Sequence, residues 1–253
     1  MFTLVAYQEA KPTTTVPIAI AAVPDQHVRT DGAVIYMADI NEIIGVYAGG
    51  HLELNDAYLA SPSLRRLANY AIGPIALQAL PLVLDSFMMH PESPLPLEKN
   101  EGLEAIITAD ATVGAVFTTV GVLLADGPVM PISGEIFHVR ATCPALTGAA
   151  LAWQNRELTF DDTLPVGRYQ IVGAKCFGPT VILFRFVPIG EAHRPGGLGS
   201  NLLGIKTIDL QRNGGLGVWC EFDQITPPSV DFLKGIAAGT DALALHIDLI
   251  KIS

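Results

Sequence analysis

Short runs that are apolar or that alternate between apolar and polar residues dominate the chain. Five of them are "GEIFHVRAT" (134–142), "GRYQIVGA" (167–174), "TVILFRFVP" (180–188), "GVWCEFDQ" (217–224) and "ALALHIDLIKI" (242–252). Runs of this length, bounded by Gly, Pro, Asn or Asp, predict β-strands. The last run alternates from Leu243 to Leu249, until Ile250 shifts the phase, so we expect one core face and one face toward solvent or a neighbour.

Helix signals are few. In "SPSLRRLANYA", Ser61 is a candidate N-cap and Pro62 suits the first helical position, and Gly73-Pro74 would end this short helix. A second short helix is predicted over residues 231–237. The 18 prolines and 24 glycines supply the many turns that a sandwich or barrel needs. We therefore predict an all-β fold with one or two short helices.

A turn-rich stretch near the midpoint, "ADGPVMPISG" (125–134), is the best boundary between two domains. The two halves also close in the same order: an apolar strand, a proline-rich turn, a second apolar segment, a spacer and a long terminal strand. Upstream, "SPSLRRLANYAIGPIAL" and "RPGGLGSNLLGIKTIDL" occupy corresponding places. We predict tandem β-barrels over residues 1–126 and 127–253. A single large sandwich, or one barrel with an embellishment, is the alternative.

The composition adds a need to hide apolar surface. Half of the 253 residues are hydrophobic and only 16% are charged, which favours burial between subunits as well as within the chain. We find no apolar stretch near the roughly 20 residues of a membrane helix and no secretory signal, so we expect the chain to fold where it is made. The formal charge of −10 disfavours direct nucleic-acid binding.

The stretch "RPGGLGSNLLGIKT" (194–207) comes within one residue of a phosphate-binding P-loop. Ile205 separates Gly204 from Lys206-Thr207, and the segment after it alternates like a strand. A P-loop requires a strand, a glycine-rich turn and a helix start in immediate succession. We therefore interpret the stretch as a connecting turn, in which Pro195 fixes one angle and the glycines permit positive φ.

Other candidate chemistry is sparse. The six histidines lie far apart, and Cys143, Cys176 and Cys220 show no metal-binding spacing and are interpreted as buried thiols. Ser200 lacks a nucleophile motif and is interpreted as a turn hydroxyl, and Asp161-Asp162 as the cap of a turn. We expect no catalytic residue, no metal and no cofactor.

Two features of the sequence are compatible with glycoside hydrolysis or carbohydrate binding. Glu221 and Asp223 alternate along one strand and could serve a glycosidase, although period-two carboxylates are usually ordinary outward residues. The aromatic residues Trp153, Trp219, Tyr169 and Phe222 could line a sugar platform, although most aromatic residues of a sandwich belong to its core. A carbohydrate-binding or glycoside-hydrolysing β-sandwich is therefore the alternative function.

The paired β-rich halves, the midpoint turn, the apolar composition and the absence of a catalytic motif together resemble the double jelly-roll major capsid proteins of tailless DNA viruses. The stretch "GEIFHVRATCPALTGAALAWQNRELTFDDTLPVGRYQIVGAKCFGPTVILFRFVPI" followed by "HRPGG" is also similar to the strands of a phage virion protein. This resemblance implies two barrels of eight strands and three subunits per pseudo-hexagonal capsomer of an icosahedral shell.

The resemblance also implies partners and a location. The protein would assemble in the host cytoplasm, reside in the virion, and contact itself as a homotrimer together with other virion proteins. Arg65, Arg66, Arg194 and Arg212 are the candidate interface residues, because a guanidinium offers a planar fork to a neighbour's carboxylates or carbonyls. A vertex, spike or tail component of a virion is a further structural alternative.

Overall fold

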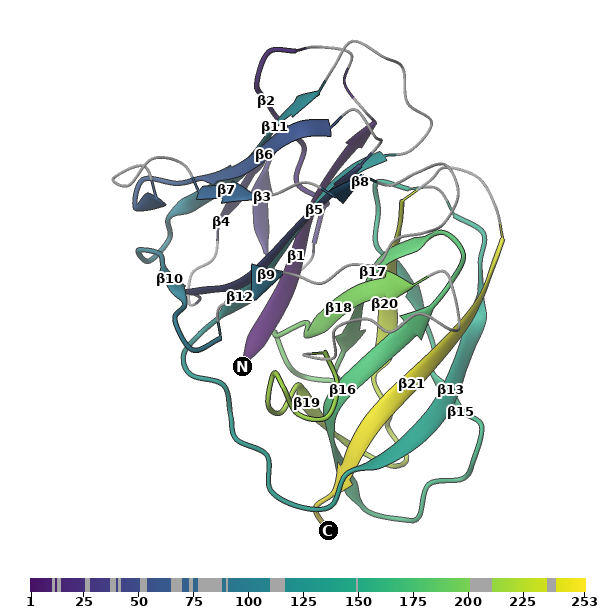
Figure 1. The fold of residues 1–253 in the computed structure, drawn as a ribbon. Coiled ribbons are helices and arrows are strands. Elements are labelled where there is room, and N and C mark those ends of the chain that lie inside the picture. The colour runs from purple at the N-terminus through teal and green to yellow at the C-terminus, as the bar shows by residue number, and fades with distance from the viewer. Residues whose placement is uncertain are drawn as a thin grey trace.

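The computed structural model shows an all-β chain, as the sequence predicts (Figure 1). It describes residues 1–10, 12, 15–25, 28–36, 40, 42–50, 54–64, 70–72, 75–76, 88–89, 91–109, 117–148, 150–200, 211–235 and 240–253. Those residues contain no α-helix. In that part of the chain, no helix could therefore cross a membrane.

The first half of the chain, up to residue 126, forms two sheets. Sheet 1 has the order β1 (Phe2–Ala10), β12 (Phe117–Ala125), β5 (Glu42–Gly50) and β10 (Leu95–Pro96), and β8 (Ile75–Ala76) and β9 (Met88–Met89) also pair with β5. Sheet 2 has the order β3 (Arg29–Asp31), β4 (Val34–Tyr36), β11 (Gly102–Ala109), β6 (Leu54–Ala60) and β7 (Tyr70–Ile72), and β2 (Ile18–Ala19) pairs with β11.

The second half, from residue 127, forms one continuous sheet, sheet 3. Its order is β14 (Gln154–Arg156), β20 (Ser229–Lys234), β17 (Val181–Val187), β18 (Gly196–Ser200), β16 (Arg168–Phe177), β21 (Asp241–Lys251), β13 (Phe137–Leu146) and β15 (Thr159–Phe160), and β19 (Cys220–Asp223) pairs with β16. The five strands predicted in this half are confirmed. The turn-rich stretch 125–134 falls between β12 and β13, in the long connection along the lower edge of Figure 1.

The strands of the two halves pair with one another in the same order. In the first half, β1 pairs with β12 and β12 with β5; in the second, β13 pairs with β21 and β21 with β16. Likewise β11 lies between β4 and β6, and β20 lies between β14 and β17. A parallel contact recurs as well, between β5 and β8 and between β16 and β18.

Sheet 1 is buried on both faces. Val5, Tyr7 and Val122 point into the core between sheets 1 and 2. Residues of the opposite face, such as Leu4 and Leu123, belong to the core of the second half. Burial on both faces explains why β1 and β12 read as continuous apolar runs rather than as an alternation.

The alternation predicted for β21 is confirmed, and the structure explains why it stops at Ile250. Leu243, Leu245, Ile247 and Leu249 are all buried in the main core. Ile250, which shifts the phase, is also buried because Val172 and Val218 cover the outer face there, with Ile132 and Ile136 of the connection packed against them.

The glycine-rich stretch near residue 196 is a strand, so the predicted turn is wrong at these residues. Gly196, Gly197 and Gly199 do not have positive φ. A Cβ on Gly196 would lie 2.1 Å from the carbonyl oxygen of Phe184, and one on Gly199 2.6 Å from that of Val181. The glycines are therefore required for the close approach of β18 to β17. Ser200 is a buried residue of β18, not a turn hydroxyl, and residues 201–210 lie outside the described residues.

The helix predicted over residues 231–237 is wrong, because residues up to Lys234 form β20. This strand pairs with β17 on one side and β14 on the other, and both ladders need an extended backbone. At the other predicted helix, the Leu64 N–H donates to the Ser61 hydroxyl at 3.3 Å, as an N-cap would accept it. Residues 65–69, the rest of that prediction, lie outside the described residues.

Candidate functional site

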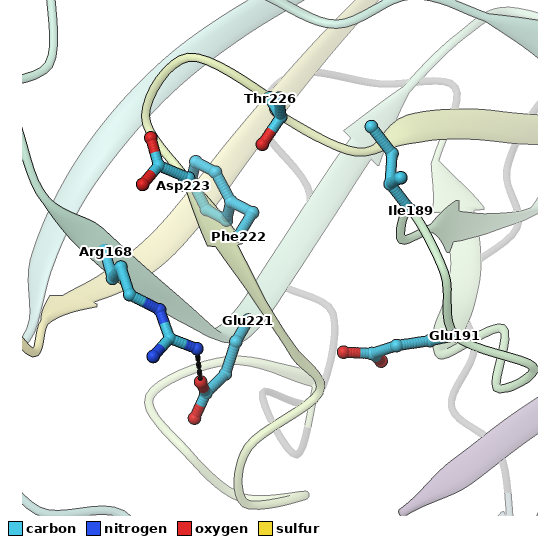
Figure 2. Close-up of a pocket in the computed structure, with 7 residues that line it drawn as sticks. All are labelled: Arg168, Ile189, Glu191, Glu221, Phe222, Asp223 and Thr226. Atoms are coloured by element: carbon cyan, nitrogen blue, oxygen red, sulfur yellow. Dashed lines mark hydrogen bonds and ion pairs between the residues drawn. The ribbon is translucent and has the colours of Figure 1, made fainter.

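An open pocket of about 330 Å³ lies at one end of the second half (Figure 2). Strands β16 and β19 and the segments that follow β17 and β19 supply its walls. The lining residues are Arg168, Ile189, Glu191, Glu221, Phe222, Asp223 and Thr226. Three carboxylates and one guanidinium therefore share a polar hollow with an exposed isoleucine.

Glu221 projects outward from β19. Its neighbours along the strand, Cys220 and Phe222, are buried, so the alternation turns Glu221 and Asp223 outward, as predicted. Arg168 Nη2 and Gln170 Nε2 donate to its two oxygens, each at 2.8 Å. Each oxygen of the Glu221 carboxyl group therefore accepts a hydrogen bond from a side chain of β16.

Glu191 follows β17 and points toward Glu221 in Figure 2. Its Oε2 atom is buried and has no hydrogen-bond partner. Burial raises the pKa of the Glu191 carboxyl, the negative charge of Glu221 raises it further, and Arg194 acts in the opposite direction. The pocket thus combines a carboxyl that resists ionisation with a second carboxyl group whose two oxygens each accept a hydrogen bond.

Such a pair has two chemical uses. A carboxyl group with a raised pKa next to a second, hydrogen-bonded carboxyl group is the arrangement of a general acid with a carboxylate partner, as in glycoside hydrolysis. Alternatively, a poorly satisfied carboxylate and its neighbours attract a cation or a hydrogen-bond donor from a partner.

The aromatic residues of the sugar-platform hypothesis belong to the core instead. Trp219 and Tyr169 are fully buried, and Phe222 stacks on both Tyr169 and Phe160. The core interpretation of these residues is therefore confirmed. Trp153 packs on the same core beneath Arg185, whose guanidinium carbon lies 4.0 Å from the ring centroid.

Arg194 is placed at the contact between the two halves. Only 4% of the residue is exposed. Its N–H donates to Thr3 Oγ1 at 3.2 Å, and its carbonyl oxygen accepts from the Leu4 N–H at 2.8 Å. Its Nη1 atom donates to the Glu191 carbonyl at 2.5 Å, so the turn that carries Glu191 is fastened to β1.

Arg212 lies on the outer face of sheet 3, apart from Arg194. Its Nε and Nη2 atoms donate to the two oxygens of Asp248 at 3.1 and 2.5 Å, and His138 Nδ1 lies 2.6 Å from Asp248 Oδ1. Subunit contact stays a prediction for both arginines, which already bind groups of their own chain. Arg65 and Arg66 lie outside the described residues.

The sequence does not predict the contacts that several charged residues make. Arg185 on β17 is buried against Asp25 and Asp231, and Glu191 gives the pocket its unpaired oxygen. Their spacing in the sequence carries no signal, because each partner lies on a distant strand or turn. The only hint is the position of Arg185 inside the apolar run "VILFRFV".

Two of the three cysteines match the prediction of buried thiols. Cys176 and Cys220 are buried, Cys143 is half-buried, and none of the three forms a disulfide bond. Burial raises the pKa of Cys143 to about 12, so this thiol is not a nucleophile at neutral pH. Among the described residues, no group of three or more His, Cys, Asp or Glu side chains could hold a metal ion.

Comparison with known proteins yields no relative. The chain matches no protein family, no curated protein and no solved structure.

Proposed function

We propose that the protein is a double jelly-roll major capsid protein, a structural component of a virion that assembles through trimeric capsomers into an icosahedral shell. In this proposal, residues 1–126 and 127–253 are two jelly-roll barrels, and the chain works by assembly rather than by catalysis. The observation that carries the proposal is the repeated order of strand partners in the two halves.

A jelly roll has eight strands in two sheets, arranged as two Greek keys. Its first strand pairs with the eighth, the eighth with the third, the second with the seventh, and the seventh with the fourth. In the first half, β1, β4, β5, β6, β11 and β12 pair in this way. In the second half, β13, β14, β16, β17, β20 and β21 do so. Eight strands can be arranged in many different orders, so we do not expect both halves to match the jelly-roll pairing order by chance.

The contact between the halves supports a rigid subunit with two barrels. The outer face of sheet 1 packs on the core of the second half, and the Phe2 and Trp219 rings form a T-shaped contact with centroids 5.5 Å apart. A subunit whose barrels are fixed to each other can present one defined outline to its neighbours.

Exposed apolar side chains support assembly as well. Val166, Ile189 and Ile225 are 85%, 73% and 78% exposed. The Gln224 N–H donates to the Gly167 carbonyl, which brings the loop of Val166 next to the turn of Ile225. Ile189 lines the adjoining pocket. Burial of such side chains between subunits would contribute roughly 25 cal/mol per Å² before the cost of association.

Sedimentation velocity of the purified chain tests the proposal. We expect a species with three times the 26.9 kDa mass of the monomer, and larger particles at higher concentration. A monomer that persists over the whole concentration range would overturn it.

A glycoside-hydrolysing sandwich is the second candidate, and the pairing of Glu191 with Glu221 is the observation that favours it. Turnover of aryl glycosides that is lost in both Glu191→Gln and Glu221→Gln would establish it. Lack of turnover and of glycan binding in the unaltered chain would exclude it.

A further inference from the structure

The outer face of sheet 3 carries three basic residues side by side. Arg140 on β13 pairs in register with His246 on β21, and His246 pairs in register with Lys175 on β16. We call these three residues the basic row. Cross-strand neighbours lie about 5 Å apart, and like charges in such positions destabilise a sheet.

His246 lies among the other charged groups of this face. Burial lowers the pKa of His246, and Arg212, Arg140 and Lys175 lower it further, while Asp161 acts in the opposite direction. Arg140 forms an ion pair with Asp161, and Arg212 forms one with Asp248. Asp248 is fully buried and neutralises the charge of Arg212.

The same chain carries the complementary surface. We call the pocket lined by Glu191, Glu221 and Asp223 the acidic pocket; Ile189 lines it as well. The turn of Ile225 also adjoins it, since Asp223 accepts the Ile225 N–H at 3.1 Å. An acidic hollow next to exposed aliphatic side chains fits the charged head and apolar stem of an arginine or lysine.

We propose that the basic row of one copy docks into the acidic pocket of the next copy. This inference rests on the proposed function and names one of its subunit contacts. In a head-to-tail arrangement each copy uses both surfaces with different neighbours, and such contacts close into rings when the rotation between copies permits. Each copy then both gives and receives the same contact, as a trimeric capsomer requires.

The charge distribution favours a second copy over a nucleic acid as the partner. Arg140 is ion-paired with Asp161, whose side chain is 33% exposed, so the row presents a small positive charge rather than the extended basic surface that a run of phosphate groups requires. The chain as a whole has a formal charge of −10, which opposes the approach of a polyanion. An acidic pocket bounded by its own guanidinium, Arg168, offers a smaller and better matched target.

Charge reversal with rescue tests the contact. Arg140→Glu makes the basic row acidic, Glu191→Lys makes the pocket basic, and the double variant restores opposite charges on the two surfaces. We expect each single variant to weaken the trimer by about tenfold or more in sedimentation at low salt, and the double variant to recover most of this loss. Lys99→Glu, at an exposed turn of the first half, is the control for Arg140→Glu with the same change of charge, and Glu92→Lys, at another exposed turn of that half, is the control for Glu191→Lys.

Thermal melting first establishes that the variants fold, and the assembly of each variant then decides whether the contact exists. Singles that match their controls, or a double variant that remains as weak as the singles, would overturn the contact while leaving the proposed function intact. Loss of binding to a 20-base-pair DNA duplex in Arg140→Glu, with unchanged assembly, would make nucleic acid the partner and overturn it too. An unaltered chain that never assembles instead refutes the proposed function itself.

Discussion

Arg185 on β17 and Asp25 of the first half form an ion pair whose two side chains are only 3% and 4% exposed. The guanidinium also donates to the Leu4 carbonyl at 3.2 Å and to Asp231 Oδ2 through Nε and Nη2 at 3.0 and 2.9 Å. One buried arginine therefore binds a strand, a loop and a neighbouring strand on both sides of the contact between the halves. Buried charge needs such partners, because it has lost its hydration.

Replacing Asp25 is expected to destabilise the whole chain. Asp25→Ala leaves a buried guanidinium with one carboxylate instead of two, and breaking a buried pair costs about 3 kcal/mol. Urea unfolding monitored by Trp fluorescence measures the change, since Trp153 stacks on Arg185.

The control is Asp161→Ala, which removes an ion pair with 52% and 33% exposed side chains. Solvent screens that pair, so we expect a loss below about 1 kcal/mol. Equal effects of the two substitutions would mean that the contact between the halves does not depend on Arg185.

Gly196 tests the close approach of β18 to β17. A methyl group there would collide with the Phe184 carbonyl oxygen at 2.1 Å and with the Arg185 Cα at 2.6 Å, both of them backbone atoms. We expect Gly196→Ala to lower the free energy of unfolding by about 2 kcal/mol or more. In Gly235→Ala the nearest atom, Ile182 Cβ, is 3.5 Å away, and thermal melting of the two variants should therefore differ clearly.

The strands of sheet 3 were predictable because alternation and turn residues are local signals. The glycines of β18 were not, because a glycine needed for positive φ and one needed for close packing look alike in a sequence. Likewise, the apolar stretch of β20 fits a helix or a strand, and only pairing with β17 and β14 decides between them.

The candidate site was predictable to a smaller extent. Alternation along β19 predicts that Glu221 points outward. No local sequence feature predicts that the Glu191 carboxyl faces Glu221, because the segment after β17 and strand β19 come together only when sheet 3 has folded. For the same reason, the sequence marks Arg194 as a surface candidate, although the fold buries it against Thr3 and Leu4.

Asp248 should make stability depend on pH in the acid range. Burial alone would raise the pKa of Asp248, but hydrogen bonds from Arg212, the Asn213 N–H and His138 outweigh it and hold this pKa below the ordinary value of 3.8. The folded state then favours the charged form, so its stabilisation is complete above about pH 4 and is lost as the pH falls through the lowered pKa. Urea unfolding from pH 2 to 6 should show this slope, and Asp248→Asn should flatten it.

Glu191 should have the opposite sign. Its raised pKa means that ionisation is less favourable in the folded chain than in the unfolded one. The cost is present at neutral pH and disappears as the pH falls below the ordinary value of 4.5. Glu191→Gln should therefore stabilise the chain at pH 7, by less than about 1 kcal/mol for a half-buried group, and have little effect at pH 3. A loss of stability at pH 7 would contradict this account.

Electron cryomicroscopy of the assembled protein tests the central claim most directly. Two jelly rolls in each chain predict capsomers of three subunits that show six barrels in a pseudo-hexagonal outline, repeated over a closed shell. Capsomers with a single barrel per subunit, or preparations that contain only monomers at every concentration, would contradict it.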